Sequence, residues 1–293
     1  MPGWSEILNE IAGAGPNGVD AVRHKYMKAL ADYRERNVIA YYSGWLQKPG
    51  APNVSINDGD KNGFMATIHK MDRTKGLDLI LHTPGGSIPA TDSIVDYLHQ
   101  MFGNNIEVFI PQLAMSAGTM IACSSRKIYM GKQSSIGPFD PQYRGVPCHG
   151  VVEEFETAIS ESSRKPSSLP FWRAIVEKYD PTFLGECKKS IQMASEFVKN
   201  QLQKCMFAGM PNAKNLAGTV VGKLGDHKAT KTHERHFNAD FARSCGLVVE
   251  NIENDQALQD AVLSVHHCFM HTFTFGRASK IIENGDGVAM YLL

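Results

Sequence analysis

The stretch Asp78-Leu-Ile-Leu-His-Thr-Pro-Gly-Gly86 decides the fold, together with Ala114-Met-Ser-Ala-Gly-Thr119 further along the chain. The first is an apolar strand that runs into a Pro-Gly-Gly turn, and the second places a serine among small residues. Gly85 and Ser116 are 116 − 85 = 31 positions apart, about the length of one right-handed βαβ crossover. Because such a unit brings two strand ends to the same carboxyl edge of a parallel sheet, we expect the two turns to lie side by side, where open α/β sheets bind ligands.

The chemistry of these two turns suits acyl transfer. Glycine permits positive φ and close approach, so the amides of Gly85 or Gly86 can point at an oxygen. If Ser116 begins a helix, the free amides of the first turn favour negative charge beside its hydroxyl. A nucleophile and donors for an oxyanion would then share one small volume. Pro-Gly-Gly turns also close many strands for steric reasons and serine is a common helix N-cap, so the spacing alone leaves a purely structural role open.

The pattern along the chain predicts an α/β fold with a mostly parallel sheet. Strands are expected at 37–42, 77–81, 106–110 and 127–130, and they alternate with helices at 63–70 and 88–101, as in βαβ units. Additional helices are expected at about 5–35 and, in the C-terminal third, at 151–163, 169–179, 183–207, 239–245 and 255–275. We therefore divide the chain into an N-terminal helical extension (1–36), a main domain (37–250, with a helical segment at about 151–222), and a C-terminal helix and tail (251–293).

Composition limits the classes of function. The 293 residues carry 30 Lys and Arg against 30 Asp and Glu, so no overall field attracts nucleic acid or an anionic membrane. No apolar run is long enough to cross a bilayer, and the N-terminus lacks the pattern of a signal peptide. The six cysteines contain no C-x-x-C pair and are expected to be free thiols. These features predict a cytoplasmic protein with no membrane anchor and no nucleic-acid partner.

A wider set of motifs resembles the serine dehydrogenase proteinase family, relatives of Clp protease and signal peptide peptidase A that have the crotonase-like fold of repeated ββα/βαβ units. The motifs are Leu81-His-Thr-Pro-Gly-Gly86, Ala114-Met-Ser-Ala-Gly-Thr119, Gly137-Pro-Phe-Asp-Pro-Gln142, and Thr232-His233 followed by Ala242 and Gly246-Leu247. The resemblance implies an ATP-independent serine peptidase that acts on peptides or proteins and assembles as a homo-oligomer. It implies Ser116 as nucleophile, and Gly85, Gly86 and the amide of Ala117 around the oxyanion.

The proton acceptor is less directly indicated. In Clp protease, a histidine lies one strand and a turn beyond the serine, and an aspartate lies just before an Ala-x-x-x-Gly-Leu segment. This chain carries the two residue types in exchanged positions, which makes His233 the expected base and Asp140 its orienting partner, since a triad is defined by geometry. His227 or His236 could replace His233. Lys188 on the long helix is the alternative base, by analogy with the lysine dyad of signal peptide peptidase A.

Two other functions use the same features. A crotonase-type enzyme would stabilise a thioester enolate with the same amides and would need neither Ser116 nor His233, and a silent scaffold would need no chemistry at all. His267 and His271 are spaced like metal ligands on a helix, but no third ligand follows at useful spacing. The sequence therefore predicts no metal and no cofactor.

Overall fold

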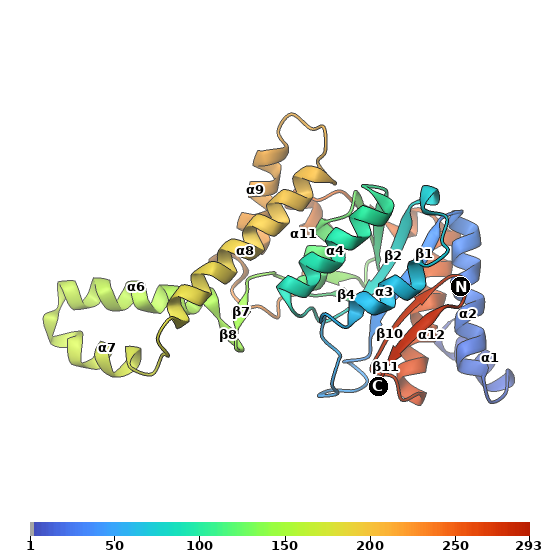
Figure 1. The fold of residues 1–293 in the computed structure, drawn as a ribbon, viewed down its shortest axis with the longest axis horizontal. Helices are drawn as coiled ribbons and strands as arrows, with labels where there is room; N and C mark the ends of the chain where they lie inside the picture. Colours follow the sequence, from blue (N-terminus) through green and yellow to red (C-terminus); the bar gives the residue numbers. More distant parts are fainter. Residues whose placement is uncertain (1–2) are drawn as a thin grey trace.

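The computed structural model describes residues 3–293 and is built around a seven-stranded mixed sheet. The strand order is β11-β10-β1-β2-β3-β5-β9, and Figure 1 labels the first four of these strands. The parallel strands are β1 (Asn37–Ser43), β2 (Leu77–His82), β3 (Ile106–Ile110), β5 (Lys127–Met130) and β9 (Val249–Asn251). Antiparallel β10 (Lys280–Asn284) and β11 (Ala289–Leu292) extend the sheet beyond β1. The predicted α/β class with a mostly parallel sheet is confirmed.

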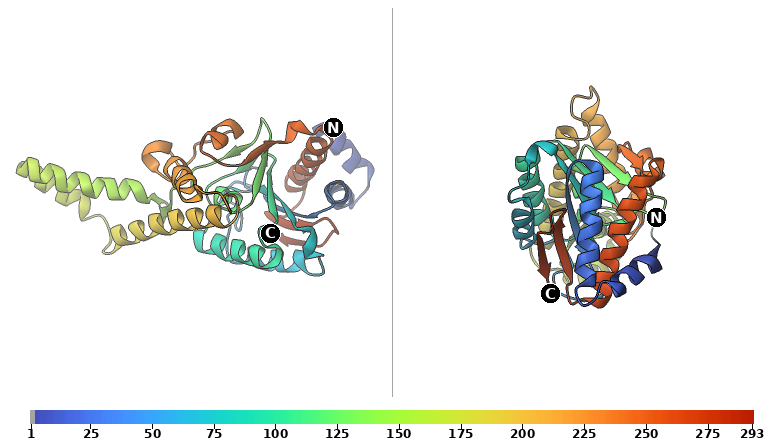
Figure 2. Two further views of the ribbon diagram at one scale, coloured as in Figure 1. Left: turned by 90° about the horizontal axis from the view of Figure 1, so that it is seen from above. Right: turned by 90° about the vertical axis from the view of Figure 1, so that its right-hand side faces the viewer.

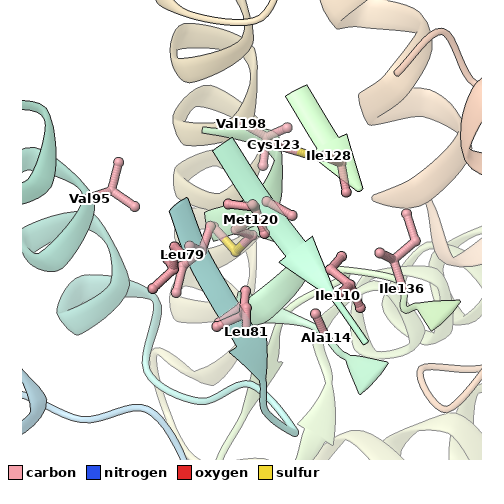
Figure 3. Packing of buried hydrophobic residues seen from close by; sticks show 14 of the residues in the cluster. Leu79, Leu81, Val95, Ile110, Ala114, Met120, Cys123, Ile128, Ile136 and Val198 are labelled. Atoms are coloured by element: carbon pink, nitrogen blue, oxygen red, sulfur yellow. The ribbon is translucent and has the colours of Figure 1, made fainter. Parts of the chain in front are cut away.

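Helices cover both faces of this sheet because alternate strand residues point to opposite sides. Ile39 and Tyr41 belong to the core under α3 (Asp60–Ile68), α4 (Ile88–Phe102) and α5 (Ala117–Cys123). In that core, Leu79 of β2 lies near Met120 of α5, and Leu81, Val95 and Val198 belong to the same cluster (Figure 3). The neighbours Val38, Ala40 and Tyr42 face α2 (Gly18–Arg34) and α12 (Gln256–Phe275) instead. Short 3-10 turns occur at Arg73–Lys75, Pro166–Ser168 and Ile252–Asn254.

The two ends of the chain compare differently with the sequence expectation. The helical character expected at about 5–35 is confirmed, and it is divided between two helices, because α1 (Trp4–Gly13) ends before Gly15, which has φ 79°, and Pro16, and α2 starts at Gly18. The C-terminal tail forms β10 and β11, which were not predicted. In β10 the polar residues Lys280, Glu283 and Asn284 are fully buried, so the strand lacks the alternation of apolar and polar residues by which strands are recognised.

A helical arm extends away from the sheet (Figures 1 and 2). It begins at the hairpin of β7 (Gln142–Tyr143) and β8 (Val146–Pro147) and continues through α6 (Cys148–Arg164) and α7 (Leu169–Val176). The long α8 (Phe183–Lys204) returns to the body. These helices confirm the expected ones at 151–163, 169–179 and 183–207. After the arm come α9 (Ala213–Leu224), which lies at the end of the helical segment expected at about 151–222 but was not predicted as a separate helix, α10 (His227–Thr230) and α11 (Ala239–Ser244).

A small second layer of strand pairs lies beyond the carboxyl ends of the central strands. In it β4 (Leu113–Ala114) pairs in parallel with β6 (Ser135–Ile136). Isolated β-bridges pair Thr83 with Ala114, Gly86 with Ile56, and Phe237 with Ile136. Five segments that are far apart in sequence therefore meet at one edge of the fold. Within residues 3–293, no helix is both long and apolar enough to span a bilayer.

Candidate active site

The two turns that opened the sequence analysis are joined directly by backbone hydrogen bonds. Thr83 N–H donates to Leu113 O (3.0 Å), and Met115 N–H donates to Thr83 O (3.0 Å). Gly118 lies close behind, where a Cβ would come within 2.5 Å of the Thr83 methyl group. The expectation that the Pro-Gly-Gly turn and the serine turn lie side by side is confirmed.

Ser116 occupies a strained turn between β4 and α5. Its φ of 52° and ψ of −116° are those of the first central residue of a type II′ turn, a position dominated by glycine. The turn is closed by Gly118 N–H, which donates to Met115 O (2.8 Å). Such a backbone costs about 1–3 kcal/mol for a residue with a side chain. A strained turn from strand to helix is also how hydrolases expose a nucleophilic serine. The Ser116 hydroxyl is half-buried and does not cap α5.

The glycine turn presents one free amide, that of Gly86. Gly85 N–H donates to the hydroxyl of Thr83 (3.1 Å), so this amide is engaged within the turn. Ile56 N–H donates to Gly85 O (2.8 Å), and Ser87 N–H donates to Ile56 O (2.9 Å). In a parallel bridge of this kind the residue between those two groups points its own N–H to the other side. Within residues 3–293 the Gly86 N–H has no acceptor, and Gly86 lines the cleft that contains Ser116.

Gly85 has a steric role beside the serine. Its φ is 97°, and a Cβ there would lie 2.7 Å from Met115 O, 2.7 Å from Ser116 Cβ and 3.0 Å from Ala117 N. Only glycine allows the two turns to approach this closely. Ala117 is the first residue of α5, so its N–H has no acceptor within the helix. The free amides beside Ser116 are therefore those of Gly86 and Ala117, while Gly85 provides the space between them.

Asp140 is buried between two histidines. His233 Nδ1 lies 3.0 Å from Asp140 Oδ1, and His227 Nδ1 lies 3.1 Å from Asp140 Oδ2. An ionised carboxylate only accepts hydrogen bonds, so a neutral imidazole at either position would donate to it through Nδ1 and would leave Nε2 as the basic nitrogen. His233 lines the cleft with Ser116, whereas His227 is not part of the cleft wall. The structure thus brings Ser116, His233 and Asp140 to one region, and adds His227 to the carboxylate.

Local structure explains how Asp140 and the histidines meet. Ile136 and Phe237 exchange backbone hydrogen bonds of 2.9 and 2.8 Å, which brings the loop containing His233 alongside the segment that leads to Asp140. Asp226 caps α10 by accepting from Lys228 N–H (2.9 Å) and so fixes the start of the helix at His227. Neither pairing has a local signal in the sequence, because both depend on strand contacts between residues about a hundred positions apart.

The cleft has a volume of about 560 Å³. Its wall combines the glycine turn, Ser116 and His233 with side chains from the base of the arm, including Tyr143, Ser190 and Met193. Lys188, the alternative base, is solvent-exposed on α8 and does not line the cleft. The structure therefore does not bring this lysine to the serine.

The remaining histidines considered from sequence lie elsewhere. His82 is fully buried beside Trp45 and His266, with ring centroids 4.3 and 5.3 Å away. His267 and His271 pack against Trp4, with ring centroids 5.4 and 4.2 Å away. Over residues 3–293 no group of three or more His, Cys, Asp or Glu side chains could hold a metal ion.

Comparison with known proteins places this site in a family. Residues 18–169, which include both turns and Asp140, match the family described as ClpP-like SDH-type serine proteinase. Two uncharacterized proteins of Methanocaldococcus jannaschii are similar to the chain. One is 26% identical over 78% of this chain and 73% of its own length. The other is 32% identical over 67% of this chain and 59% of its own length.

A more distant similarity links the chain to a protease of known type. The ATP-dependent Clp protease proteolytic subunit of Lactococcus lactis is 33% identical over 75 residues, which are 25% of this chain and 37% of that protein. The family match covers just over half of the chain and contains the strained serine turn beside the free Gly86 amide. The chain therefore belongs to the ClpP-like SDH-type serine proteinase family.

Proposed function

We propose that this protein is a serine peptidase that hydrolyses peptide bonds without ATP through an acyl-enzyme on Ser116. The observation that carries the proposal is the convergence of three groups at one cleft. These are a serine on a strained turn, a Gly86 N–H with no acceptor in residues 3–293, and a histidine oriented by a buried carboxylate. Membership of a serine proteinase family supports the same chemistry.

The proposed reaction begins with attack of Ser116 Oγ on the carbonyl carbon of the scissile bond. His233 Nε2 takes the hydroxyl proton as the bond forms, and Asp140, 3.0 Å from Nδ1, stabilises the resulting imidazolium. The carbonyl oxygen becomes an oxyanion that accepts hydrogen bonds from the N–H groups of Gly86 and Ala117. His233 then gives its proton to the leaving amine as the C–N bond breaks.

Deacylation repeats these steps with water. The water molecule loses a proton to His233 Nε2 and attacks the acyl carbon, and the proton returns to Ser116 Oγ as the ester bond breaks. The strained backbone of Ser116 supports this cycle because it projects the hydroxyl from the turn while the amide of Ala117 follows directly. No metal or cofactor takes part in any step.

A homo-oligomer is part of the proposal, and the helical arm supports it. Ile159, Leu169 and Phe171 are large apolar side chains on α6 and α7, each more than half exposed at 57–68%. They lie on the segment that extends away from the sheet (Figure 2). Large apolar side chains exposed on a protruding segment would be covered if the arm packed against another copy of the chain. The six cysteines are free and buried, which supports a reducing, cytoplasmic location.

A fluorophosphonate probe tests the catalytic assignment in the absence of ATP. The wild-type protein should be labelled at Ser116 and should cleave a denatured protein substrate, and Ser116→Ala should lose both properties. Ser163→Ala, which changes an exposed serine on α6, serves as the matched control and should keep both. His233→Ala should lower the labelling rate by about 10²- to 10⁴-fold, the usual contribution of a general base. A folded wild-type protein that is neither labelled nor active would contradict the proposal.

A further inference from the structure

The free amide of Gly86 takes its direction from a neighbouring segment, Ser55 to Asn57. Both backbone groups of Ile56 are used by the glycine turn, with Ile56 N–H on Gly85 O and Ser87 N–H on Ile56 O. The fit is tight, because a Cβ on Gly86 would collide with the backbone N and O of Ile56 and lie 2.8 Å from its Cα. Any shift of this segment therefore shifts the turn.

A buried ion pair holds the same segment from behind. Lys280 Nζ donates to Ser55 O (2.8 Å) and to Asp60 Oδ1 (2.6 Å). The other carboxylate oxygen, Asp60 Oδ2, accepts from Asn57 N–H (3.0 Å) and from the hydroxyl of Tyr41 (2.7 Å). Lys280, Asp60 and Tyr41 are all fully buried. The backbone on either side of Ile56 is thus tied to the sheet through one charged pair.

We propose that the Lys280–Asp60 ion pair is a positioning device that clamps the Ser55–Asn57 segment and thereby aims the Gly86 N–H at the reacting carbonyl oxygen. This role rests on the proposed peptidase function. Lys280 does not touch the substrate, since its side chain is fully buried and is not part of the cleft wall. It acts through Ser55 O, Ile56 and the turn, in that order.

The energetics of buried ion pairs favour a positioning role over a purely stabilising one. Removing two charges from water costs several kcal/mol per ion, so well-packed apolar residues are often at least as stabilising as a buried pair. Burial lowers the pKa of Lys280, and the Asp60 carboxylate opposes that effect. The ion pair makes directed hydrogen bonds to two backbone groups of one segment, Ser55 O and Asn57 N–H. Apolar residues could not make these bonds.

The chain contains a matched control on the same strand. Arg23 and Glu283 form a second fully buried ion pair, with Nε and Oε2 2.5 Å apart. Glu283 lies three residues from Lys280 on β10. Arg23 donates to Thr272 and Tyr291, and within residues 3–293 it makes no hydrogen bond or ion pair with the Ser55–Asn57 segment. Arg23→Met therefore breaks a buried pair of the same kind without touching the proposed clamp.

Hydrogen exchange tests the clamp independently of activity. In Lys280→Met the amides of Ile56 and Ser87 should exchange at least about tenfold faster than in the wild type, while the amides of β3 stay protected. Arg23→Met should leave Ile56 and Ser87 protected. If Lys280→Met does not fold, the neutral double variant Lys280→Met with Asp60→Asn replaces it, because it leaves no unpaired buried charge. Unchanged exchange at Ile56 and Ser87 would overturn the inference, whether or not the protein is a peptidase.

Kinetics test the consequence for catalysis. At a temperature where the variants are folded, Lys280→Met should lower kcat by about 10- to 100-fold, as expected for a misaimed oxyanion donor. KM should change by less than about threefold. A peptide aldehyde, whose adduct with Ser116 carries an oxyanion, should lose affinity by a similar factor, while a product peptide should not. A kcat equal to that of Arg23→Met would refute the positioning role. Inactivity of the wild type would refute the proposed function. The exchange measurement would still show whether the Lys280–Asp60 pair holds the Ser55–Asn57 segment in place.

Discussion

Replacing Gly85 by alanine should disable the site through the serine turn. The added Cβ would lie 2.7 Å from both Ser116 Cβ and Met115 O, whereas non-bonded carbons prefer a separation of about 3.5–4.0 Å. The overlap is thus about 1 Å. Because both neighbours belong to the nucleophile turn, relief of the clash must displace Ser116 or the glycine turn. A misplacement of ~1 Å can cost about 10²-fold in rate.

The stability change for Gly85→Ala has two parts. The φ of 97° is unfavourable for alanine and costs about 1–3 kcal/mol, and the clash adds about 1–3 kcal/mol of overpacking. Gly103→Ala is the matched control, since Gly103 also has positive φ (58°) but a Cβ there meets nothing within 4 Å. Gly103→Ala should therefore lower the free energy of unfolding only by the backbone cost, and it should keep full activity.

The assay combines urea unfolding with the rate of fluorophosphonate labelling of Ser116. Gly85→Ala should unfold with a free energy about 1–3 kcal/mol lower than Gly103→Ala. Under conditions where both are folded, its labelling rate should be at least about 100-fold lower. A Gly85→Ala protein that is labelled as fast as Gly103→Ala would show that the close approach of the two turns does not set the geometry of the serine.

Three further predictions concern the carboxylate, the buried histidines and the arm. Asp140→Asn should lower kcat by about 10⁴-fold because an amide can hold His233 in the wrong tautomer. His227→Ala should keep most of the activity. A peptide hydrolysis assay measures both effects. Burial lowers the pKa of His266 to about 3, so only the unfolded chain binds this proton between pH 6.5 and 3. His266 alone should therefore make the free energy of unfolding fall with falling pH by about 1.4 kcal/mol per unit, and His266→Gln should reduce the measured slope in urea unfolding. Phe171→Asp should weaken self-association in light scattering without lowering the melting temperature, since Phe171 is exposed.

The central α/β body could be predicted because its signals are local. The apolar strands β2 and β3, the turn at Gly85 and the helix that starts after it are each specified by neighbouring residues. Ser87 caps α4 by accepting from Ala90 N–H (3.3 Å), and Gly103 ends it. The spacing of the two turns predicts that they lie side by side, because a crossover between parallel strands has one favourable hand and a typical length.

The parts that could not be predicted depend on distant partners. Strand β10 carries Lys280 and Glu283, which are found in a buried strand only because Asp60 and Arg23 meet them there. The role of Ile56 was also hidden, since it lies in a segment rich in Gly, Pro and Asn that has no periodic pattern. Among the predicted site residues, Gly85 was expected to supply an amide, but the hydroxyl of Thr83, two residues before it, accepts from that N–H.

The position of β10 has a consequence for how the chain can be divided. The residues that match the family, 18–169, contain Ser116 and Asp140 but neither His233 nor Lys280. A fragment cut to those limits would also leave β1 without its antiparallel neighbour. The unpaired edge of β1 would then be free to pair with other copies, which is a common route to aggregation. The half of the chain that matches the family is thus not a separable module, and engineering of this protein must retain the strands that follow α12.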